Sequence, residues 1–292
     1  MDREDHAFDF AAAPPRSAPG VASMVGYRTA ADSPIPHRGL PSSRLTFIVS
    51  LDDGVEAAAT AEALPQAAPA PLILGGLHTR ASYVTQRRGQ SGIQLAVHPL
   101  AARALFGVPA AELPLIDFNG TPVLGRWSAR LPQAAADAGD WPQRFALIAG
   151  ALTDRWNDAG HAGDQVRPEL AYAWHLLDRS RGRIPITALA DAVGFTPRHL
   201  GTLFHRETGR SPKQIAGLIR FERASSLIAA QVNARGDTDL AGVAAATGFS
   251  DQAHLTREFT RYCGTGPRQW ITEELRNIQD GGHGARAVLN HD

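Results

Sequence analysis

The C-terminal part of the chain contains one sequence pattern twice, and this repeat constrains the fold more than any other feature. Gly194-Phe195 aligns with Gly248-Phe249 at an offset of 54 residues. After one inserted residue, Phe204 aligns with Phe259 at an offset of 55 residues. A doubled unit of this length predicts two copies of one small structural module.

The first copy has the spacing of a helix, a tight turn and a second helix. Leu189, Ala190 and Val193 lie on one face at helical spacing. Gly194 follows at the place where a left-handed residue ends a helix at little cost. Thr196 is then expected to cap the second helix, with Pro197 in its first turn. The copy therefore predicts a helix-turn-helix.

The second copy repeats this order. Val243 and Ala244 are expected on the inner face, Gly248 at the turn and Ser250 at the helix cap. A connecting helix is expected from about 212 to 230, with an inward stripe that holds the two units at a fixed separation. The inward apolar residues expected in the second helix of each unit and in the connecting helix are Leu200, Leu203, Phe204, Leu255, Phe259, Phe221, Ala224 and Ile228.

These segments resemble the tandem helix-turn-helix domain of AraC/XylS-type transcriptional regulators. The resemblance rests on LADAVGFTPRHLGTLFHRETGRSP, IRFERASSLI and VAAATGFSDQAHLTREFTRYCGTGP, and it covers residues 166–276. It implies a DNA-binding domain over 165–278 and sequence-specific transcription regulation. Double-stranded promoter DNA, RNA polymerase and a second copy of the chain are the macromolecular partners it implies.

The second helix of each unit is expected to carry the DNA contacts, because its early residues meet base edges in the major groove. The family motif aligns Arg198, Gly201 and Thr202 with base-facing positions in the first unit, and Gln252, Ala253 and Arg257 in the second; ordinary solvated helix residues are the alternative. The other outward side chains included in the expected interface are His199, His205, Arg206, Lys213, His254 and Thr256.

Other arginines near the motifs have less specific expectations. Arg206, Arg210 and Lys213 are expected at phosphates, which position a protein on DNA without reading its sequence. Arg220 and Arg223 are expected either at phosphates or in intramolecular ion pairs. The whole chain has 29 Lys+Arg and 29 Asp+Glu, whereas residues 165–278 have 15 and 11, a modest basic bias.

Residues 21–135 have a different texture, because short apolar runs with β-branched residues alternate there with Pro and Gly. The runs lie at 44–51, 71–78, 82–86 and 92–99. They predict a β-sandwich or barrel, with a short helix at 99–107 and a turn at 110–113. The segment is similar to the N-terminal sensor domains of AraC-type regulators, which implies a small-molecule effector of unknown identity.

Helices are expected between these two domains. Phe145, Ile148, Leu152 and Trp156 form an apolar stripe in a linker helix within 136–164. The stripe either packs on the sensor domain of its own chain or mediates dimerisation. A further helix is expected at 167–178, after a hinge at 161–164. Residues 1–20 are expected to be a disordered lead, and residues 279–292 a flexible tail. The fold class is thus α+β multidomain.

Other features bear on compartment and chemistry. The single cysteine, Cys263, excludes intramolecular disulfides and is expected to be a small buried side chain. The acidic N-terminus lacks the pattern of a signal peptide, and no apolar run is long enough to span a membrane. A soluble cytoplasmic, nucleoid-associated protein is therefore expected.

A metal-dependent, cupin-like β-barrel enzyme with a helical appendage is the alternative function. It would use His37, His78 and His98, which lie in the β-rich region. These histidines have no short ligand-like spacing and no accompanying carboxylate motif. The expectation is therefore a protein without catalytic residues, metal or cofactor.

Overall fold

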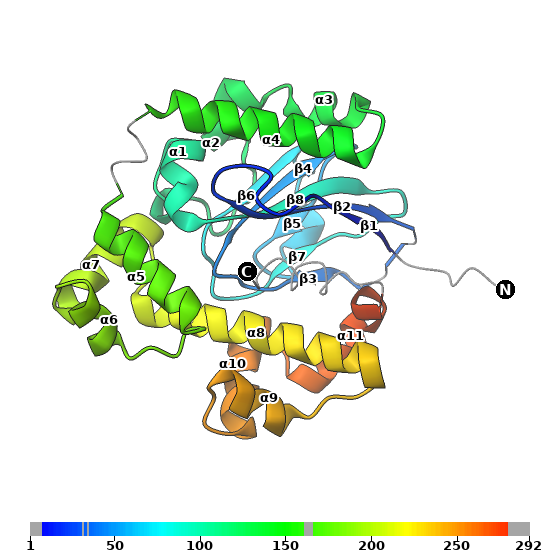
Figure 1. Cartoon of the computed structure of the whole chain (residues 1–292). Coiled ribbons are helices and arrows are strands. Elements are labelled where there is room, and N and C mark those ends of the chain that lie inside the picture. Colours follow the sequence, from blue (N-terminus) through cyan, green and yellow to red (C-terminus); the bar gives the residue numbers. More distant parts are fainter. Residues whose placement is uncertain (1–7, 31, 34, 161–165, 280–292) are drawn as a thin grey trace.

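The computed structural model describes residues 8–30, 32–33, 35–160 and 166–279. Two β-sheets form the N-terminal part, and helices form the C-terminal part below them (Figure 1). The larger sheet has five strands in the order β1-β2-β8-β4-β6, and the smaller has three in the order β3-β7-β5. The strands are β1 (Phe8–Ala12), β2 (Val21–Thr29), β3 (His37–Gly39), β4 (Leu45–Ser50), β5 (Ala57–Ala58), β6 (Leu72–Gly75), β7 (Ser82–Val84) and β8 (Ser91–Val97).

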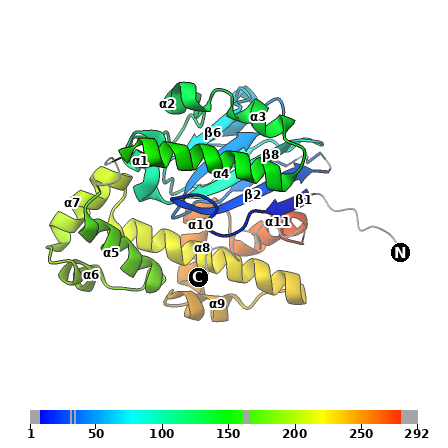
Figure 2. The same ribbon diagram turned by 45° about the horizontal axis from the view of Figure 1, so that its top comes forward.

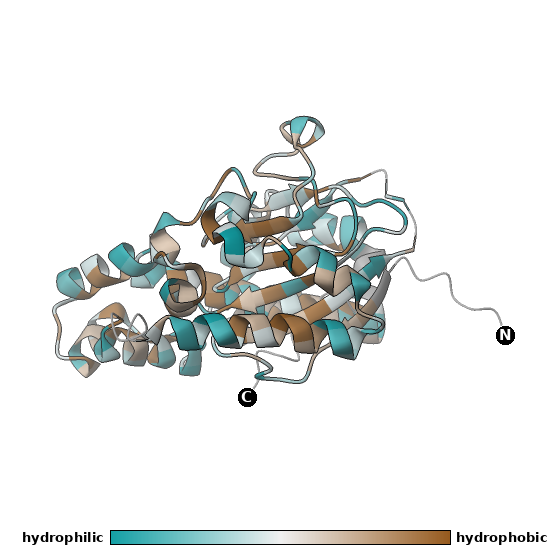
Figure 3. Ribbon diagram, turned by 90° about the horizontal axis from the view of Figure 1, so that it is seen from above, coloured by the Kyte–Doolittle hydropathy of each residue, from teal (hydrophilic) through white to brown (hydrophobic). Residues whose placement is uncertain are grey.

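The larger sheet is antiparallel, and its two faces pack against different parts of the molecule. Side chains alternate along a strand, so Phe47 and Val49 on β4 share one face and Ile48 takes the other. Phe47 packs edge-on against Phe106 at 5.7 Å, in the core beneath the covering helices. Ile48 belongs to a separate apolar cluster with Ile73 and faces the smaller sheet. Figure 3 shows the mainly apolar strands of this sheet among the helices.

Helices cover the first face of the sheet, as Figure 2 shows for α4. Phe145, Ile148 and Leu152 on α4 are buried in the same core as β4 and β8, and Trp156 packs against it. The expected stripe therefore packs on the chain's own β domain. The helices and turns of this half are η1 (Leu64–Gln66), η2 (Pro99–Ala101), α1 (Ala102–Phe106), η3 (Ala110–Glu112), α2 (Thr121–Leu124), η4 (Gly125–Ser128), α3 (Leu131–Asp137) and α4 (Trp141–Asp158).

In the described part of the chain, seven helices follow α4 and include the two predicted helix-turn-helix units. The first unit lies at one end of the long helix α8, and the second lies beneath α8 (Figure 1). Their bounds are α5 (Pro168–Arg179), α6 (Ile186–Ala192), α7 (Pro197–Thr208), α8 (Pro212–Arg235), α9 (Leu240–Thr247), α10 (Gln252–Cys263) and α11 (Pro267–Gln279).

The two units belong to different cores. The first unit shares a continuous core with the β domain, in which Trp174 contacts His98 at 5.0 Å and stacks on Phe204 at 6.0 Å. The second unit has its own core, in which Phe259 packs between Phe221 at 5.1 Å and Trp270 at 5.4 Å. The first unit is thus attached to the β domain by apolar packing, which the sequence did not reveal.

Three expectations concern the disordered lead, the hinge and the tail. The disordered lead expected for 1–20 is wrong where the structure describes it, because β1 pairs antiparallel with β2 and Ala13 and Ala18 are buried. Paired backbone groups and buried methyl groups hold this segment despite its Ala- and Pro-rich composition. Residues 1–7, the expected hinge, and 280–292 of the expected tail lie outside the described residues.

Candidate nucleic-acid interface and ligand pocket

The turn of the first helix-turn-helix unit is built as expected. Gly194 lies just after the end of α6 and has a φ of 71°, a left-handed conformation that glycine adopts without steric cost. The Thr196 hydroxyl accepts the backbone N–H of His199 at 3.2 Å and caps α7, with Pro197 in the first turn. Ala190 is fully buried where α6 and α7 come close. These features fix the angle at which α7 is presented.

The second unit has the same geometry with a different cap. Gly248 ends α9 with a φ of 81°. The expected cap, Ser250, is wrong by one residue, because the Asp251 carboxylate accepts the His254 N–H at 2.7 Å. This hydrogen bond holds the pKa of Asp251 below its usual value. Serine and aspartate cap helices about equally well, and the carboxylate adds a negative charge that is favourable at a helix start.

The outward residues of α7 are accessible. Arg198, Thr202 and Arg206 are exposed, and His199 and His205 are exposed beside them. His199 packs edge-on against Phe195 at 4.8 Å, while the Thr202 hydroxyl donates to the Arg198 carbonyl at 3.1 Å.

The outward face of α10 is divided between free and packed side chains. Gln252 and Arg257 are exposed, whereas His254 and Thr256 are only partly so. The His254 ring lies edge-on to Phe249 at 5.3 Å, and its Nδ1 is 3.1 Å from the Ser250 hydroxyl. His254 therefore supports the turn of its own unit, and Gln252 and Arg257 are the freer polar side chains on this face.

Helix α8 sets the separation of the two units. It extends to Arg235, beyond the expected end near residue 230. Its start is secured by a capping box between Ser211 and Gln214, and its inward residues Phe221 and Ile228 are fully buried. Lys213 is exposed in its first turn.

The β domain is also tied to the first unit by polar contacts. The Arg103 guanidinium donates to the Glu207 carboxylate on α7 at 2.8 Å, and Glu207 is only 4% exposed. Arg210 was expected at a phosphate, but its Nε donates to the Leu77 carbonyl at 2.5 Å. Burial lowers the pKa of Arg210. No local sequence pattern indicates these pairs, because their partners lie more than a hundred positions apart.

The smaller sheet is tied to the second unit. Arg38 on β3 donates to the Cys263 carbonyl at 2.9 Å and pairs with Glu273 at 2.8 Å. The Ala81 N–H, just before β7, donates to the Tyr262 carbonyl at 2.8 Å. Cys263 is buried as expected, and burial raises the pKa of its thiol to about 12.

Two further contacts join the β domain to α8 and α5. Glu222 on α8 accepts the Ser42 and Ser43 hydroxyls at 2.5 and 2.6 Å. Arg44 donates to Asp178 on α5 at 2.9 Å. These contacts connect this part of the β domain directly to α5 and α8.

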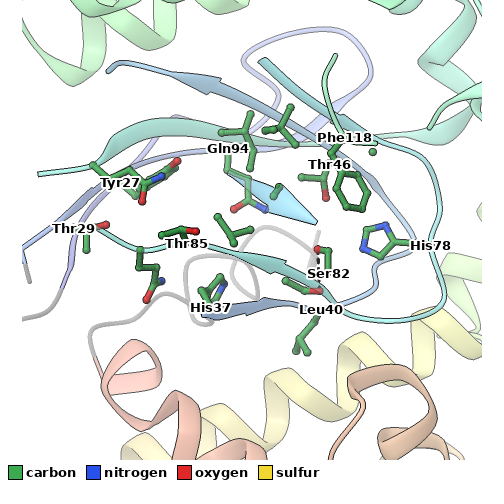
Figure 4. A pocket seen from close by; sticks show the side chains of 18 of the residues that line it. Tyr27, Thr29, His37, Leu40, Thr46, His78, Ser82, Thr85, Gln94 and Phe118 are labelled. Carbon is green, nitrogen blue, oxygen red and sulfur yellow. Dashed lines mark hydrogen bonds between the residues drawn. The ribbon is translucent and has the colours of Figure 1, made fainter. Parts of the chain in front are cut away.

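A cavity of about 120 Å³ lies between the two sheets (Figure 4). Its apolar wall includes Ile48, Ile73 and Phe118, and Gln94 on β8 is among its polar lining residues. The other polar lining residues are Tyr27, Thr29, His37, Thr46, His78, Ser82, Thr85, Gln86 and Gln90. None of these described residues is Lys, Arg, Asp or Glu. Burial, and then the charge of Asp52, raises the pKa of Tyr27.

The three histidines considered as metal ligands do not come together. His37 and His78 line the cavity, whereas His98 packs against Trp174. Within the described ranges, no group of three or more His, Cys, Asp or Glu side chains is placed to hold a metal ion. In the same part of the chain, every helix is too short or too polar to span a lipid bilayer.

His98 predicts a pH dependence of stability. Burial and then the Arg44 charge lower its pKa to about 3, whereas an unfolded histidine titrates near 6.5. The unfolded chain therefore binds the proton first as the pH falls, so stability is lost below about pH 6.5. We expect wild type to lose about 2 kcal/mol more than His98→Asn between pH 7 and 5 in urea unfolding. Asparagine keeps an acceptor for the Leu100 N–H, and equal losses would contradict the assignment.

Residues 189–273 match a family model described as a helix-turn-helix domain. No curated protein matches the chain. The fold is similar to the crystal structure of ToxT from Vibrio cholerae O395, at 10% sequence identity and a TM-score of 0.48, covering 91% of this chain and 98% of that one. ToxT from the same strain bound to (E)-4-(8-methylnaphthalen-1-yl)but-3-enoic acid is similar at 11% identity and a TM-score of 0.47, with 91% and 99% covered.

Proposed function

Since residues 189–273 are a helix-turn-helix domain, we propose that the protein is a sequence-specific DNA-binding transcriptional regulator. The observation that carries the proposal is the pair of capped, outward-facing helices α7 and α10, joined through one rigid helix. In such units the second helix enters the major groove. Two units in one chain suit successive grooves, about 34 Å apart along the duplex.

The roles of the exposed side chains follow from their chemistry. Arg198 and Arg257 suit guanine, since a guanidinium donates to O6 and N7 together, and Gln252 suits adenine. His199, Thr202, His205 and Thr256 are proposed at the edges of these contacts. Arg206 and Lys213 are proposed at phosphates. His254 is proposed to position α10.

Direct binding tests the proposal. Wild type is expected to shift a labelled random-sequence duplex at low salt and to enrich a preferred sequence from it. Arg257→Ala should weaken binding to the enriched duplex about tenfold, because one base contact is lost. Arg268→Ala removes another exposed arginine, on α11, and should leave affinity unchanged. No duplex binding by wild type would contradict the proposal.

We also propose that the cavity between the sheets binds the effector. Its lining offers hydrogen-bonding groups on an apolar background, which is typical of small-molecule sites. Its volume of about 120 Å³ is close to the ~150 Å³ of a cavity that holds benzene. The described lining has no Lys, Arg, Asp or Glu, and His37, one of its two histidines, already contacts the Glu274 carboxylate, so a buried ionic group would find little counter-charge. An uncharged, single-ring compound with polar substituents fits best.

The same walls contact the second unit, which supports a route from effector to DNA. His37 lines the cavity, and its Nδ1 is 3.2 Å from the Glu274 carboxylate on α11. Ser82 lines it too and follows Ala81, which donates to Tyr262 at the end of α10. A ligand that moves β3 or β7 would therefore change how the second unit is held. This coupling requires that the ligand bind with different affinities to the two arrangements of the second unit, before and after β3 or β7 moves.

A compound panel tests the cavity. Uncharged monocyclic compounds are expected to raise the Tm of wild type by about 5 °C at a hundredfold excess over Kd. Ala57→Phe, which places a ring in the cavity, should abolish the rise and keep DNA affinity without compound unchanged. Stabilisation by carboxylates alone would contradict the proposed ligand class.

A single chain with two units suits an asymmetric DNA site, and a homodimer would suit two copies of that site. Contact with RNA polymerase and association with the nucleoid are proposed as consequences of promoter binding. A reconstituted transcription assay on the enriched duplex, with the wild-type chain titrated in, tests whether binding changes RNA synthesis.

A further inference from the structure

Four arginines gather where the two helix-turn-helix units meet on α8. Arg181 and Arg183 lie in the turn between α5 and α6, and Arg220 and Arg223 lie on α8. We call these four residues the arginine cluster. Arg181 and Arg183 are exposed, and Arg220 and Arg223 are partly buried.

Backbone contacts hold the cluster together. The Gly182 carbonyl, between the first two arginines, accepts Nη1 of Arg220 at 2.8 Å. Gly182 has a φ of 70° and lies against Ala216, so the turn is pressed onto α8. Arg183 and Arg220 both pass over Gly248, the turn glycine of the second unit, and the Arg220 guanidinium lies 5.7 Å from the Phe249 ring. The cluster thus touches the turns of both units.

The positive charge of the cluster is not neutralised within the described chain. None of the four guanidinium groups pairs with a carboxylate there, because the nearby Asp178 and Glu222 bind Arg44 and two serines. Nε of Arg220 and Nε of Arg223 are buried without a hydrogen-bond partner. Burial, together with the charges of Arg181 and Arg183, lowers the pKa of Arg223. Close cations without a counter-charge are costly, so this arrangement favours an anion.

We propose that the arginine cluster binds a backbone phosphate of the DNA strand that passes between the two recognition helices. Guanidinium groups are suited to phosphate because their N–H groups match its oxygens. The site lies beside the start of α6 and the turn before α10, where helix-turn-helix units approach the backbone. The inference rests on the proposed DNA binding and adds a contact that fixes the register of both units without reading bases.

The salt dependence of binding tests this site. Affinity is measured against salt concentration for the enriched duplex and a scrambled duplex, with wild type, Arg183→Gln, Arg223→Gln and Arg183→Lys. Each glutamine variant is expected to reduce the slope of log K against log salt by about one. The loss should be equal for both duplexes, and Arg183→Lys should largely retain the slope. Arg235→Gln removes an exposed charge at the far end of α8 and should match wild type.

Three outcomes would overturn the inference. Wild-type slopes in both glutamine variants, with folding confirmed by thermal unfolding, would show that the cluster does not contact DNA. A second outcome combines unchanged salt slopes with stabilisation by inorganic phosphate at constant ionic strength, seen for wild type but not for Arg223→Gln. It would assign the cluster to a free anion instead. No DNA binding by wild type would contradict the proposed function and this inference together.

Discussion

Replacing Arg103 with methionine is expected to lower the free energy of unfolding by about 3 kcal/mol. The substitution leaves the Glu207 carboxylate, which is 4% exposed, without its bidentate partner at the junction of the β domain and α7. An uncompensated buried charge is the cause of the loss. Arg206 remains 3.3 Å from Glu207, which keeps the expected cost at the low end of the range for such pairs. Urea unfolding measures the change.

A double variant separates the charge effect from general damage to the interface. Arg103→Met combined with Glu207→Leu replaces both charges with apolar side chains and should recover most of the lost stability. Arg87→Met breaks the more exposed pair with Glu56 and should cost less than about 1 kcal/mol. If the double variant is as unstable as Arg103→Met, the unpaired carboxylate is not the cause.

Substituting Gly182 with alanine is expected to cost about 4 kcal/mol. At a φ of 70°, a residue with a Cβ is strained by about 1–2 kcal/mol. A Cβ at this position would also overlap the Ala216 carbonyl oxygen on α8, and such overpacking costs about 1–3 kcal/mol more. The turn would have to move away from α8 and take Arg181 and Arg183 with it. Denaturant unfolding and the salt slope of DNA binding should both change.

Gly236→Ala is the matched control for this substitution. Gly236 has a similar φ of 74° at the end of α8, but a Cβ there would meet no atom within 4 Å. It should therefore show only the conformational cost of about 1–2 kcal/mol. Equal losses at the two positions would mean that the contact between Gly182 and α8 does not hold the turn.

The sequence predicted the helical half well because its signals are local. Gly194, Gly248 and Thr196 act on neighbouring backbone groups, so their roles follow from adjacent residues. The strand runs at 44–51 and 92–99 were also correct, since a run of apolar β-branched residues suits a sheet buried on both faces. The cap of α10 was misplaced by one residue because Ser250 and Asp251 both have capping side chains.

The features that connect the domains could not be predicted in this way. Arg103 and Glu207 are distant in sequence, and neither lies in a motif. The cavity depends on how two sheets face each other, and its lining comes from most of the strands. Strand β1 has little β-pattern of its own and is stabilised by pairing with β2. Tertiary contacts, rather than local propensity, determine these parts of the molecule.

The most direct test of the account is to compare the DNA sequences selected by wild type, Arg198→Ala and Arg257→Ala from one random-sequence pool. Wild type should select two elements about 10 base pairs apart, one helical turn of DNA. Each variant should lose its preference in one element and retain the other, because α7 and α10 are proposed to read different grooves. A wild-type selection with a single element, or variants that lose both elements equally, would contradict reading by two helix-turn-helix units.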